Sequence, residues 1–235
     1  MNPLRHIVEP VGLLLTWQPQ DEQAPNRTRR VIGEVRPGKS GEAEFHYLKG
    51  TVDFDEAVKN GFQGYPAFNL RADEIFSSGV LESFLRRLPP RKRDDFAEYL
   101  ALHRLPVPFE NSDMALLAYT GARLPSDGFS LVPIFPENTA PCDFLIEIAG
   151  FRHAEGAKRE NIQIGDGVSF ACDPGNPIDQ DAIGIVHHGI RIGYVNRALR
   201  GTVSSWLENR TVTATIERLN GKPERPLVYV RIEIR

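Results

Sequence analysis

The chain has 235 residues, of which 41% are hydrophobic and 25% are charged, and its formal net charge is -3 at pH 7. This length allows one large domain or two small ones, and the slightly acidic balance excludes a chain coated with Lys and Arg for non-specific nucleic-acid binding. The longest apolar runs, 11–15 and 145–148, are far shorter than the roughly 20 residues of a membrane-spanning helix, which excludes a membrane span.

The start of the chain and its cysteines indicate the compartment. Arg5, His6 and Glu9 stand among the apolar residues of the first ten, so the charged-then-apolar order of a secretory signal is missing. We therefore expect a cytoplasmic protein. Cys142 and Cys172 have no metal-ligand spacing, and we expect both to be buried thiols in a reducing compartment.

The first half is predicted to be an α+β domain covering residues 1–135. Strand patterns are followed by helical spacing and then by one more strand, at 11–17, 31–36, 42–48, 73–88, 94–103, 113–120 and 129–134. Ser112 and Gly121 are placed to cap the third of these helices. The segment 133–141 contains three prolines and is predicted to be a stiff linker.

The second half, residues 142–235, is predicted to be a small β-barrel with one helix. Short apolar or alternating runs mark six strands, at 143–151, 167–172, 181–186, 190–195, 211–217 and 227–234. The helix is expected at 197–209, where Leu199, Val203 and Trp206 have the spacing of a buried face. Several short strands and one helix favour a compact barrel related to the OB fold.

The segment 173–183 is the most informative stretch of this half. Pro174, Gly175 and Pro177 stand among turn-forming polar side chains where a strand has just ended. Such a loop is rigid and polar, and short hydrophobic strands hold it on both sides. We therefore expect a binding site there.

The order and spacing of several short motifs resemble the HIRAN domain family. The motifs are Gly150-Phe151-Arg152, Gly165-Asp166-Gly167-Val168, Asp173-Pro174, Asn176-Pro177, Asp179 to Ile183, and Ile192-Gly193-Tyr194-Val195. The resemblance spans about 142–235 and implies a barrel related to the OB fold. It also implies a DNA-binding module, which in characterised members captures the free 3′ end of single-stranded DNA.

By this resemblance, the DNA-binding residues would be Phe151, Arg152, His153, Asn176, Ile178, Asp179, Tyr194 and Arg197. A strand end needs an acceptor such as Asp179, a cation such as Arg152 and a flat ring such as Tyr194 or Phe151. Further cations that would steer the backbone toward the pocket are Lys158, Arg159, Arg191 and Arg200.

Three positions differ from the DNA-capturing members of the family. Those members carry aromatic rings where this chain has His153, Ala154 and Ile178. A stacking platform worth roughly 1–3 kcal/mol per base is thereby thinned or removed. Ile178 would then contact a protein or simply pack. Asp179 can equally be a loop aspartate that accepts backbone N–H groups and holds the turn.

We expect no metal and no cofactor. Asp173, Asp179 and Asp181 lack the alternating carboxylates and terminal glutamate of an EF-hand. The pair His187-His188 sits on an expected hairpin tip without a third ligand in the sequence. The basic cluster formed by Arg86, Arg87 and 91–93 favours a solvated face over a phosphate contact.

The first half is similar, through less specific motifs, to the N-terminal subdomain of HipA-type toxin kinases. These motifs are 81–88 with Pro89-Pro90, 113–121 and Leu131-Val132-Pro133. The resemblance implies a protein-docking surface without a kinase core. Gly-rich phosphate loops, kinase catalytic loops and nucleophile elbows are missing from the sequence, so we expect no enzyme.

The sequence therefore leads to two functional hypotheses. The first is a non-catalytic bacterial adaptor whose HIRAN-like domain binds DNA, single-stranded or with a 3′ end. Its N-terminal domain would contact a partner protein such as a nuclease, helicase or toxin kinase. The alternative is a purely protein-interacting regulatory subunit of a toxin, defence or nuclease complex, in which DNA capture is lost.

Overall fold

The computed structural model describes residues 2–21, 27–39, 41–71, 74–124, 126–154, 158–222 and 225–235. The chain divides into two compact units. The first unit is Val8–Glu137, and the second combines Asn138–Arg235 with Asn2–Ile7. The boundary lies within the proline-containing segment 133–141. The sequence had suggested that the first residues of the chain belong to the first domain, but Asn2–Ile7 belong to the second unit.

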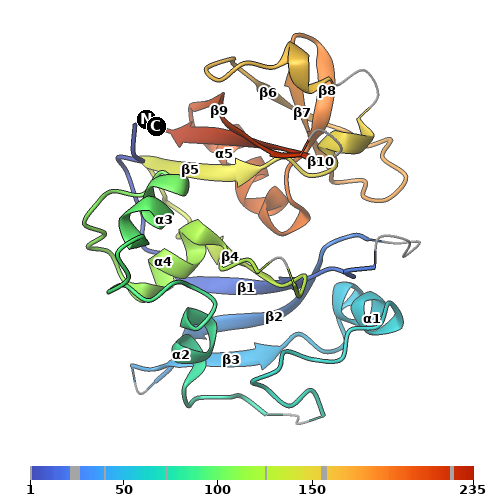
Figure 1. The fold of residues 1–235 in the computed structure, drawn as a ribbon. Helices are drawn as coiled ribbons and strands as arrows, with labels where there is room; N and C mark the ends of the chain where they lie inside the picture. Colours follow the sequence, from blue (N-terminus) through green and yellow to red (C-terminus); the bar gives the residue numbers. More distant parts are fainter. Residues whose placement is uncertain are drawn as a thin grey trace. The chain divides into compact units, whose positions relative to one another are not determined.

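The first unit is built on one antiparallel sheet (Figure 1). Its strands, in the order β3-β2-β1-β4, are β3 (Ala43–Tyr47), β2 (Arg30–Pro37), β1 (Gly12–Trp17) and β4 (Ser130–Ile134). All four strands were predicted from the sequence, and only β3 was predicted from alternating residues. Side chains of β1 and β2 are buried along nearly their whole length, because these are the two central strands.

Four helices accompany this sheet. They are α1 (Val52–Lys59), α2 (Val80–Leu85), α3 (Phe96–Leu102) and α4 (Asp113–Thr120). α4 packs on β4 and β1, while α2 packs on β3 and on α4. The predicted caps of α4 are confirmed: Ser112 Oγ accepts a hydrogen bond from Ala115 N, and Gly121 adopts the left-handed conformation with φ of 68°.

The sequence analysis missed α1. Thr51 caps this helix by accepting a hydrogen bond from Phe54 N, and Asp53 stands in the first turn, where carboxylates are favourable. Only Phe54 and Ala57 are buried, so the apolar spacing is too sparse to signal a helix. The cap and the acidic first turn were the available signals.

The helix predicted at 73–88 is much shorter than expected. Phe76 pairs with Phe45 as an isolated β-bridge, so the chain is extended just before α2. Gly79 then takes a left-handed φ of 64°, which starts the helix at Val80. Ile75, expected on the buried face, is 60% exposed, and Asp73 lies outside the described residues.

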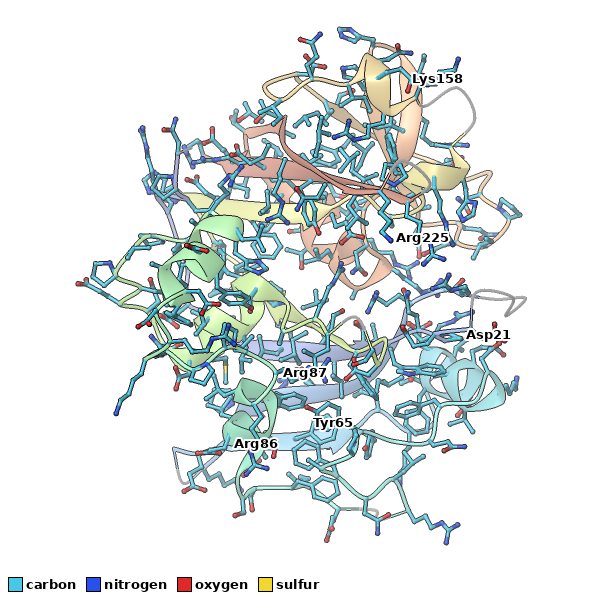
Figure 2. The ribbon with its side chains drawn as sticks, viewed as in Figure 1. Asp21, Tyr65, Arg86, Arg87, Lys158 and Arg225 are labelled. Atoms are coloured by element: carbon cyan, nitrogen blue, oxygen red, sulfur yellow. The ribbon has the colours of Figure 1, made fainter. Side chains whose placement is uncertain are left out.

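The fold separates the neighbouring arginines of the predicted basic cluster, Arg86 and Arg87. The guanidinium of Arg87 is buried, 5.7 Å from the ring centroids of both Tyr65 and Phe129 (Figure 2). It donates to both carboxylate oxygens of Asp127 at 2.6 and 2.9 Å. Its neighbour Arg86 is exposed. Arg87 is therefore a core residue and not part of a cationic surface.

The second unit contains two three-stranded antiparallel sheets (Figure 1). One has the order β5-β10-β9, and the other β6-β7-β8. The strands are β5 (Cys142–Glu147), β6 (Ser169–Cys172), β7 (Ile183–His187), β8 (Ile190–Tyr194), β9 (Val212–Lys222) and β10 (Arg225–Ile234). Each predicted strand of this half therefore has its counterpart.

Helical segments connect and cover these strands. They are the 3-10 turns η1 (Phe151–His153), η2 (Arg159–Asn161) and η3 (Arg197–Leu199), and the helix α5 (Arg200–Asn209). Asn196 starts η3 by accepting a hydrogen bond from Ala198 N. The predicted helix at 197–209 is thus a 3-10 turn followed by an α-helix, and it buries Leu199, Val203 and Trp206 as expected.

Two isolated bridges join the two sheets of this unit. Ala149, just after β5, pairs with Tyr194 of β8, and Gly167, just before β6, pairs with Thr215 of β9. The whole chain is therefore an α+β protein of small antiparallel sheets, and a closed barrel in the second unit stays a prediction.

The first residues of the chain are held by a buried carboxylate of β5. Asp143, 0% exposed, accepts from the backbone N–H groups of Arg5 and His6 at 2.9 and 3.4 Å. It also accepts from Arg231 at 3.1 Å and from Arg235 at 2.8 Å. Two backbone donors and two guanidinium groups thus satisfy one buried charge.

Among the described residues, none of the helices has the length and apolarity that a bilayer crossing requires.

Candidate nucleic-acid interface

The loop between β6 and β7 is held by its own hydrogen bonds. Asn176 Oδ1 accepts from Ile178 N at 2.9 Å and from Asp179 N at 3.1 Å, and Asp173 N donates to Ala182 O at 2.9 Å. These bonds form an Asx turn within a loop whose ends are closed. The loop is therefore pre-formed, and Asn176 shapes it instead of presenting its oxygen to a ligand.

Two arginines converge on Asp179 of this loop. Arg200, the first residue of α5, donates to Oδ1, and Arg197 of η3 lies 3.3 Å from Oδ2. Oδ1 also accepts from Asp181 N at 3.2 Å. Both carboxylate oxygens are thus engaged, so Asp179 holds the turn, as one of the two sequence interpretations proposed.

A second ion pair connects the loop to β8. Asp173 Oδ2 accepts from Arg191 at 2.8 Å and from the Tyr194 hydroxyl, also at 2.8 Å. The guanidinium of Arg191 lies 5.0 Å from the ring centroid of Tyr194. Burial and the hydrogen bond to the Asp173 carboxylate raise the pKa of the Tyr194 phenol, so it is a hydrogen-bond donor at neutral pH.

The predicted residues of the Gly150-Phe151-Arg152 motif take different roles. Phe151 is only 4% exposed and packs toward β10, so its ring is part of the core and is not available for stacking. Arg152 and His153 are exposed, and Arg152 Nε donates to His153 Nε2 at 2.8 Å. Arg152 thus contacts an imidazole where the other arginines of the site contact carboxylates.

The site joins four segments of the second unit. The bridge between Ala149 and Tyr194 sets η1 beside β8, Tyr194 reaches the loop through Asp173, and Asp179 of the loop reaches α5 through Arg200. Among the described residues, these segments and η3 bring four arginines together with the three carboxylates of Asp173, Asp179 and Asp181. We call this arrangement the arginine loop site, made of Arg152, 173–181, Arg191, Tyr194, Arg197 and Arg200.

The sequence analysis did not foresee the ion pairs of this site. Arg191 and Arg200 were expected only to steer a ligand, yet each holds an aspartate of the loop. A usable signal was the spacing of three residues between Arg197 and Arg200, which places them on one side of a helical turn. Lys158 and Arg159 are exposed at η2, so their steering role stays a prediction (Figure 2).

Ile178 and Cys172 lie at exposed positions of this region. Ile178 is 69% exposed, so the interpretation that it simply packs is wrong. Cys172, at the end of β6, is exposed, whereas Cys142 is buried as predicted. The loop therefore presents the side chain of Ile178 to solvent, beside the exposed Pro174 and Pro177.

Gly193 allows the close approach of η1 to β8. A Cβ atom there would lie 2.4 Å from Ile148 Cγ2 and 2.6 Å from Ala149 O, and φ is 143°. We expect Gly193→Ala to lower the free energy of unfolding by about 1–3 kcal/mol. Urea unfolding followed by Trp206 fluorescence measures this, with Trp17→Phe as background so that one tryptophan reports.

Gly201→Ala is the matched control for this substitution. Gly201 lies in α5, and a Cβ atom there would meet nothing within 4 Å. The same chemical change should therefore stabilise the unit by about 0.5–1 kcal/mol. Equal effects of the two substitutions would contradict a special role for the backbone at Gly193.

Comparison with known proteins gives a limited result. None of the protein-family models matches this chain, and none of the curated proteins does. Among solved structures, the HIRAN domain of human HLTF is similar to it, with 18% identity and a TM-score of 0.33 over 39% of this chain and 74% of that one. A protein from Lactobacillus plantarum has 18% identity and a TM-score of 0.29, over 38% of this chain and 91% of its own.

The sequence resembles the HIRAN family in its second half and HipA-type kinases in its first half, and the two solved structures include a named member of the first family only. A solved HIRAN domain is among the structures similar to this chain, as the motifs of the second half indicated. Neither of the two structures supports a likeness of the first unit to HipA-type kinases, which stays a prediction.

Proposed function

We propose that the second unit is a HIRAN-type DNA-binding module whose contact surface is the arginine loop site. The observation that carries the proposal is the arrangement of arginines around one pre-formed loop: Arg191, Arg197 and Arg200 on its aspartates, and Arg152 exposed in the turn beside β8. Guanidinium groups match phosphate oxygens in geometry and charge. The motifs that resemble the HIRAN family lie in the same segments.

The charge balance limits how DNA would bind. Three of the four arginines already neutralise carboxylates, so Arg152 carries the excess positive charge of the site. Few phosphates can then be neutralised, and we propose a short single strand or a strand end as the ligand, not a long duplex. For one or two phosphates, log K should fall with log salt with a slope of about -1.

A 3′ end could engage this site through an exchange of partners. Arg200 donates to Asp179 Oδ1 and also lies 3.2 Å from Asp181 Oδ2. We propose that Arg200 turns to the last phosphate, which frees Asp179 Oδ1 to accept the terminal hydroxyl. The preference for a free 3′ end would then depend on Asp179, and overall affinity on Arg152.

Fluorescence anisotropy of labelled oligonucleotides tests this proposal. We would compare single strands with free and with blocked 3′ ends, and a duplex, across a salt series. Arg152→Ala should weaken binding about tenfold without changing the unfolding midpoint. Arg86→Ala removes the same charge from an exposed position of the first unit and should leave affinity unchanged.

Two results would count against DNA binding at this site. One is the absence of saturable binding at low salt, and the other is equal affinity of Arg152→Ala and the unaltered chain. Binding that ignores the 3′ end but still needs Arg152 would reduce the proposal to a general single-strand groove. Asp179→Ala must be accompanied by thermal melting, because this residue also holds the turn.

The exposed side chain of Ile178 favours a second candidate function. An isoleucine that is 69% exposed at the tip of a rigid loop suits apolar contact with a protein partner. The chain would then be a regulatory subunit without DNA capture. Binding to such a partner should be insensitive to salt and lost in Ile178→Asp, whereas phosphate binding weakens steeply with salt.

We further propose that the protein is a non-catalytic adaptor whose first unit contacts a partner protein. In support, the aspartates of the arginine loop site hold arginines and so are not poised as free bases. The first unit carries a groove of about 380 Å³ whose lining includes Phe76, Ile75 and Glu82. A partner captured by the full chain should be lost on Ile75→Asp, which changes an exposed residue.

A further inference from the structure

Three potential metal ligands meet at the tip of the β7–β8 hairpin. Asp166, His187 and His188 each offer one ligand atom, and these atoms all lie within 4.8 Å of one another. The sequence showed the two histidines but not their companion, because Asp166 stands 21 residues before His187. The fold supplies the third ligand that the sequence analysis did not find.

The carboxylate of Asp166 is fixed by the backbone around it. Its Oδ2 accepts from Gln163 N at 2.8 Å, and the adjoining backbone is bonded to β9, with Ile216 N donating to Asp166 O at 2.8 Å. A neighbouring bond runs from Gly165 N to Ile216 O at 2.8 Å. Such hydrogen bonds orient a metal ligand before the ion arrives.

His187 points inward to this carboxylate. It is 5% exposed, and its Nε2 lies 2.9 Å from Asp166 Oδ2. As the last residue of β7 it is paired with Ile190, so its backbone is set by the hairpin. The imidazole is therefore held at hydrogen-bonding distance from an anchored carboxylate.

His188 has an unusual backbone that brings its ring to the same place. Successive side chains of a strand point to opposite faces, which would separate two adjacent histidines. His188 instead has φ of 48°, a left-handed conformation that is unfavourable for a non-glycine residue. Its ring centroid lies 4.1 Å from that of His187, with the ring planes at 63°. The left-handed backbone of His188 thus places its imidazole beside His187 and Asp166.

We propose that Asp166, His187 and His188 bind a divalent transition-metal ion of the zinc class, with water completing the coordination. Two imidazoles and one carboxylate suit zinc, whereas calcium and magnesium prefer oxygen ligands. Ligand atoms on a tetrahedral zinc lie about 3.4 Å apart, since each is 2.0–2.1 Å from the ion. The observed span, from 2.9 Å to less than 4.8 Å, needs only small side-chain movements.

The ion would clamp the hairpin tip to the segment that is bonded to β9. His188 is exposed and Asp166 partly so, which leaves the ion an entry path from solvent. This site uses none of the residues of the arginine loop site, so the proposal stands independently of DNA binding.

Calorimetric titration of the chelator-treated full chain with Zn²⁺ at pH 7.5 tests the site. We expect saturable binding of one ion per chain and a rise in the unfolding temperature on adding Zn²⁺. His188→Gly keeps the left-handed backbone while removing the ligand, and should weaken binding at least about tenfold. His46→Ala, a half-exposed histidine of β3, is the control that should leave binding unchanged.

Co²⁺ gives a second readout that a purely structural His–Asp pair would not produce. Bound to two imidazoles and a carboxylate, it should show visible absorption bands that His188→Gly and Asp166→Asn abolish. No saturable Zn²⁺ binding below about 1 mM, which corresponds to roughly 4 kcal/mol, would overturn the proposal. Binding equal in His188→Gly and the unaltered chain would also overturn it.

Discussion

Replacing Asp143 by alanine is expected to lower the free energy of unfolding of the second unit by about 3–5 kcal/mol. The side chain is fully buried, and its removal leaves Arg231, 7% exposed, without the carboxylate that it contacts at 3.1 Å. The backbone N–H groups of Arg5 and His6 lose their acceptor at the same time. The substitution therefore removes one of the two carboxylates beside the buried Arg231, which keeps Glu233 at 3.2 Å, and it weakens the attachment of the first residues of the chain.

Urea unfolding of the full chain in the Trp17→Phe background measures this loss. Trp206, 4% exposed in α5, then reports on the second unit alone. Glu208→Ala is the control, because it removes an exposed carboxylate from the same unit. Glu208 lies in α5, and its removal should change the free energy of unfolding by no more than about 0.5 kcal/mol. A loss below about 1 kcal/mol for Asp143→Ala would contradict the buried ion cluster.

The same carboxylate predicts a pH dependence. Burial acts to raise the pKa of Asp143, but the Arg5 N–H group and the guanidinium groups of Arg235 and Arg231 outweigh it, so the pKa lies below its ordinary value. The stabilisation is therefore complete above the unfolded pKa of about 3.9 and is lost as pH falls through the lowered folded pKa. Asp143→Asn should flatten the fall in stability between about pH 4 and pH 2.

We expect Arg87→Ala to destabilise the first unit by about 3 kcal/mol. The guanidinium joins α2 to the aromatic core over Tyr65 and Phe129, and it donates to Ala122 O at 2.7 Å in addition to Asp127. Truncation removes this packing and leaves the carboxylate of Asp127 without its bidentate partner. Because Asp127 keeps some solvent contact, the loss should fall at the lower end of the range for buried pairs.

The adjacent residue provides the control for this prediction. Arg86→Ala removes an identical side chain from an exposed position, and it should alter stability by about 0.5 kcal/mol or less. Unfolding followed by Trp17 fluorescence, with Trp206→Phe as background, separates the two variants. Similar losses for Arg86→Ala and Arg87→Ala would contradict the buried role of Arg87.

The elements that the sequence predicted well are those with strong local signals. α4 has a serine cap, an apolar stretch and a terminal glycine, and all three are observed. α1 was missed because only Phe54 and Ala57 face the core. The helix expected at 73–88 was too long because Phe76 joins β3 as a bridge, which is a tertiary contact that apolar spacing cannot reveal.

The candidate site shows the same limit. Turn chemistry indicated a rigid loop in the segment 173–183, because Asn176 and the prolines act locally, and the hydrogen bonds of Asn176 are observed. The partners of Asp179 come from η3 and from the start of α5, the latter 21 residues away, and were not foreseen as ion pairs. Phe151 was expected to offer its ring but is buried, since the sequence of a short turn does not say which side faces the core.

The packing of Asn2–Ile7 on the second unit has a consequence for how the protein is made. During synthesis Asn2 leaves the ribosome 229 residues before Arg231, to which its carbonyl oxygen is bonded. The first unit, whose sequence lies between the two parts, can fold domain-wise before the second unit is complete. The segment Asn2–Ile7 therefore stays without these partners until Arg231 and Arg235 have been synthesised. A fusion or tag that keeps this segment away from the second unit would leave Asp143 without the N–H groups of Arg5 and His6.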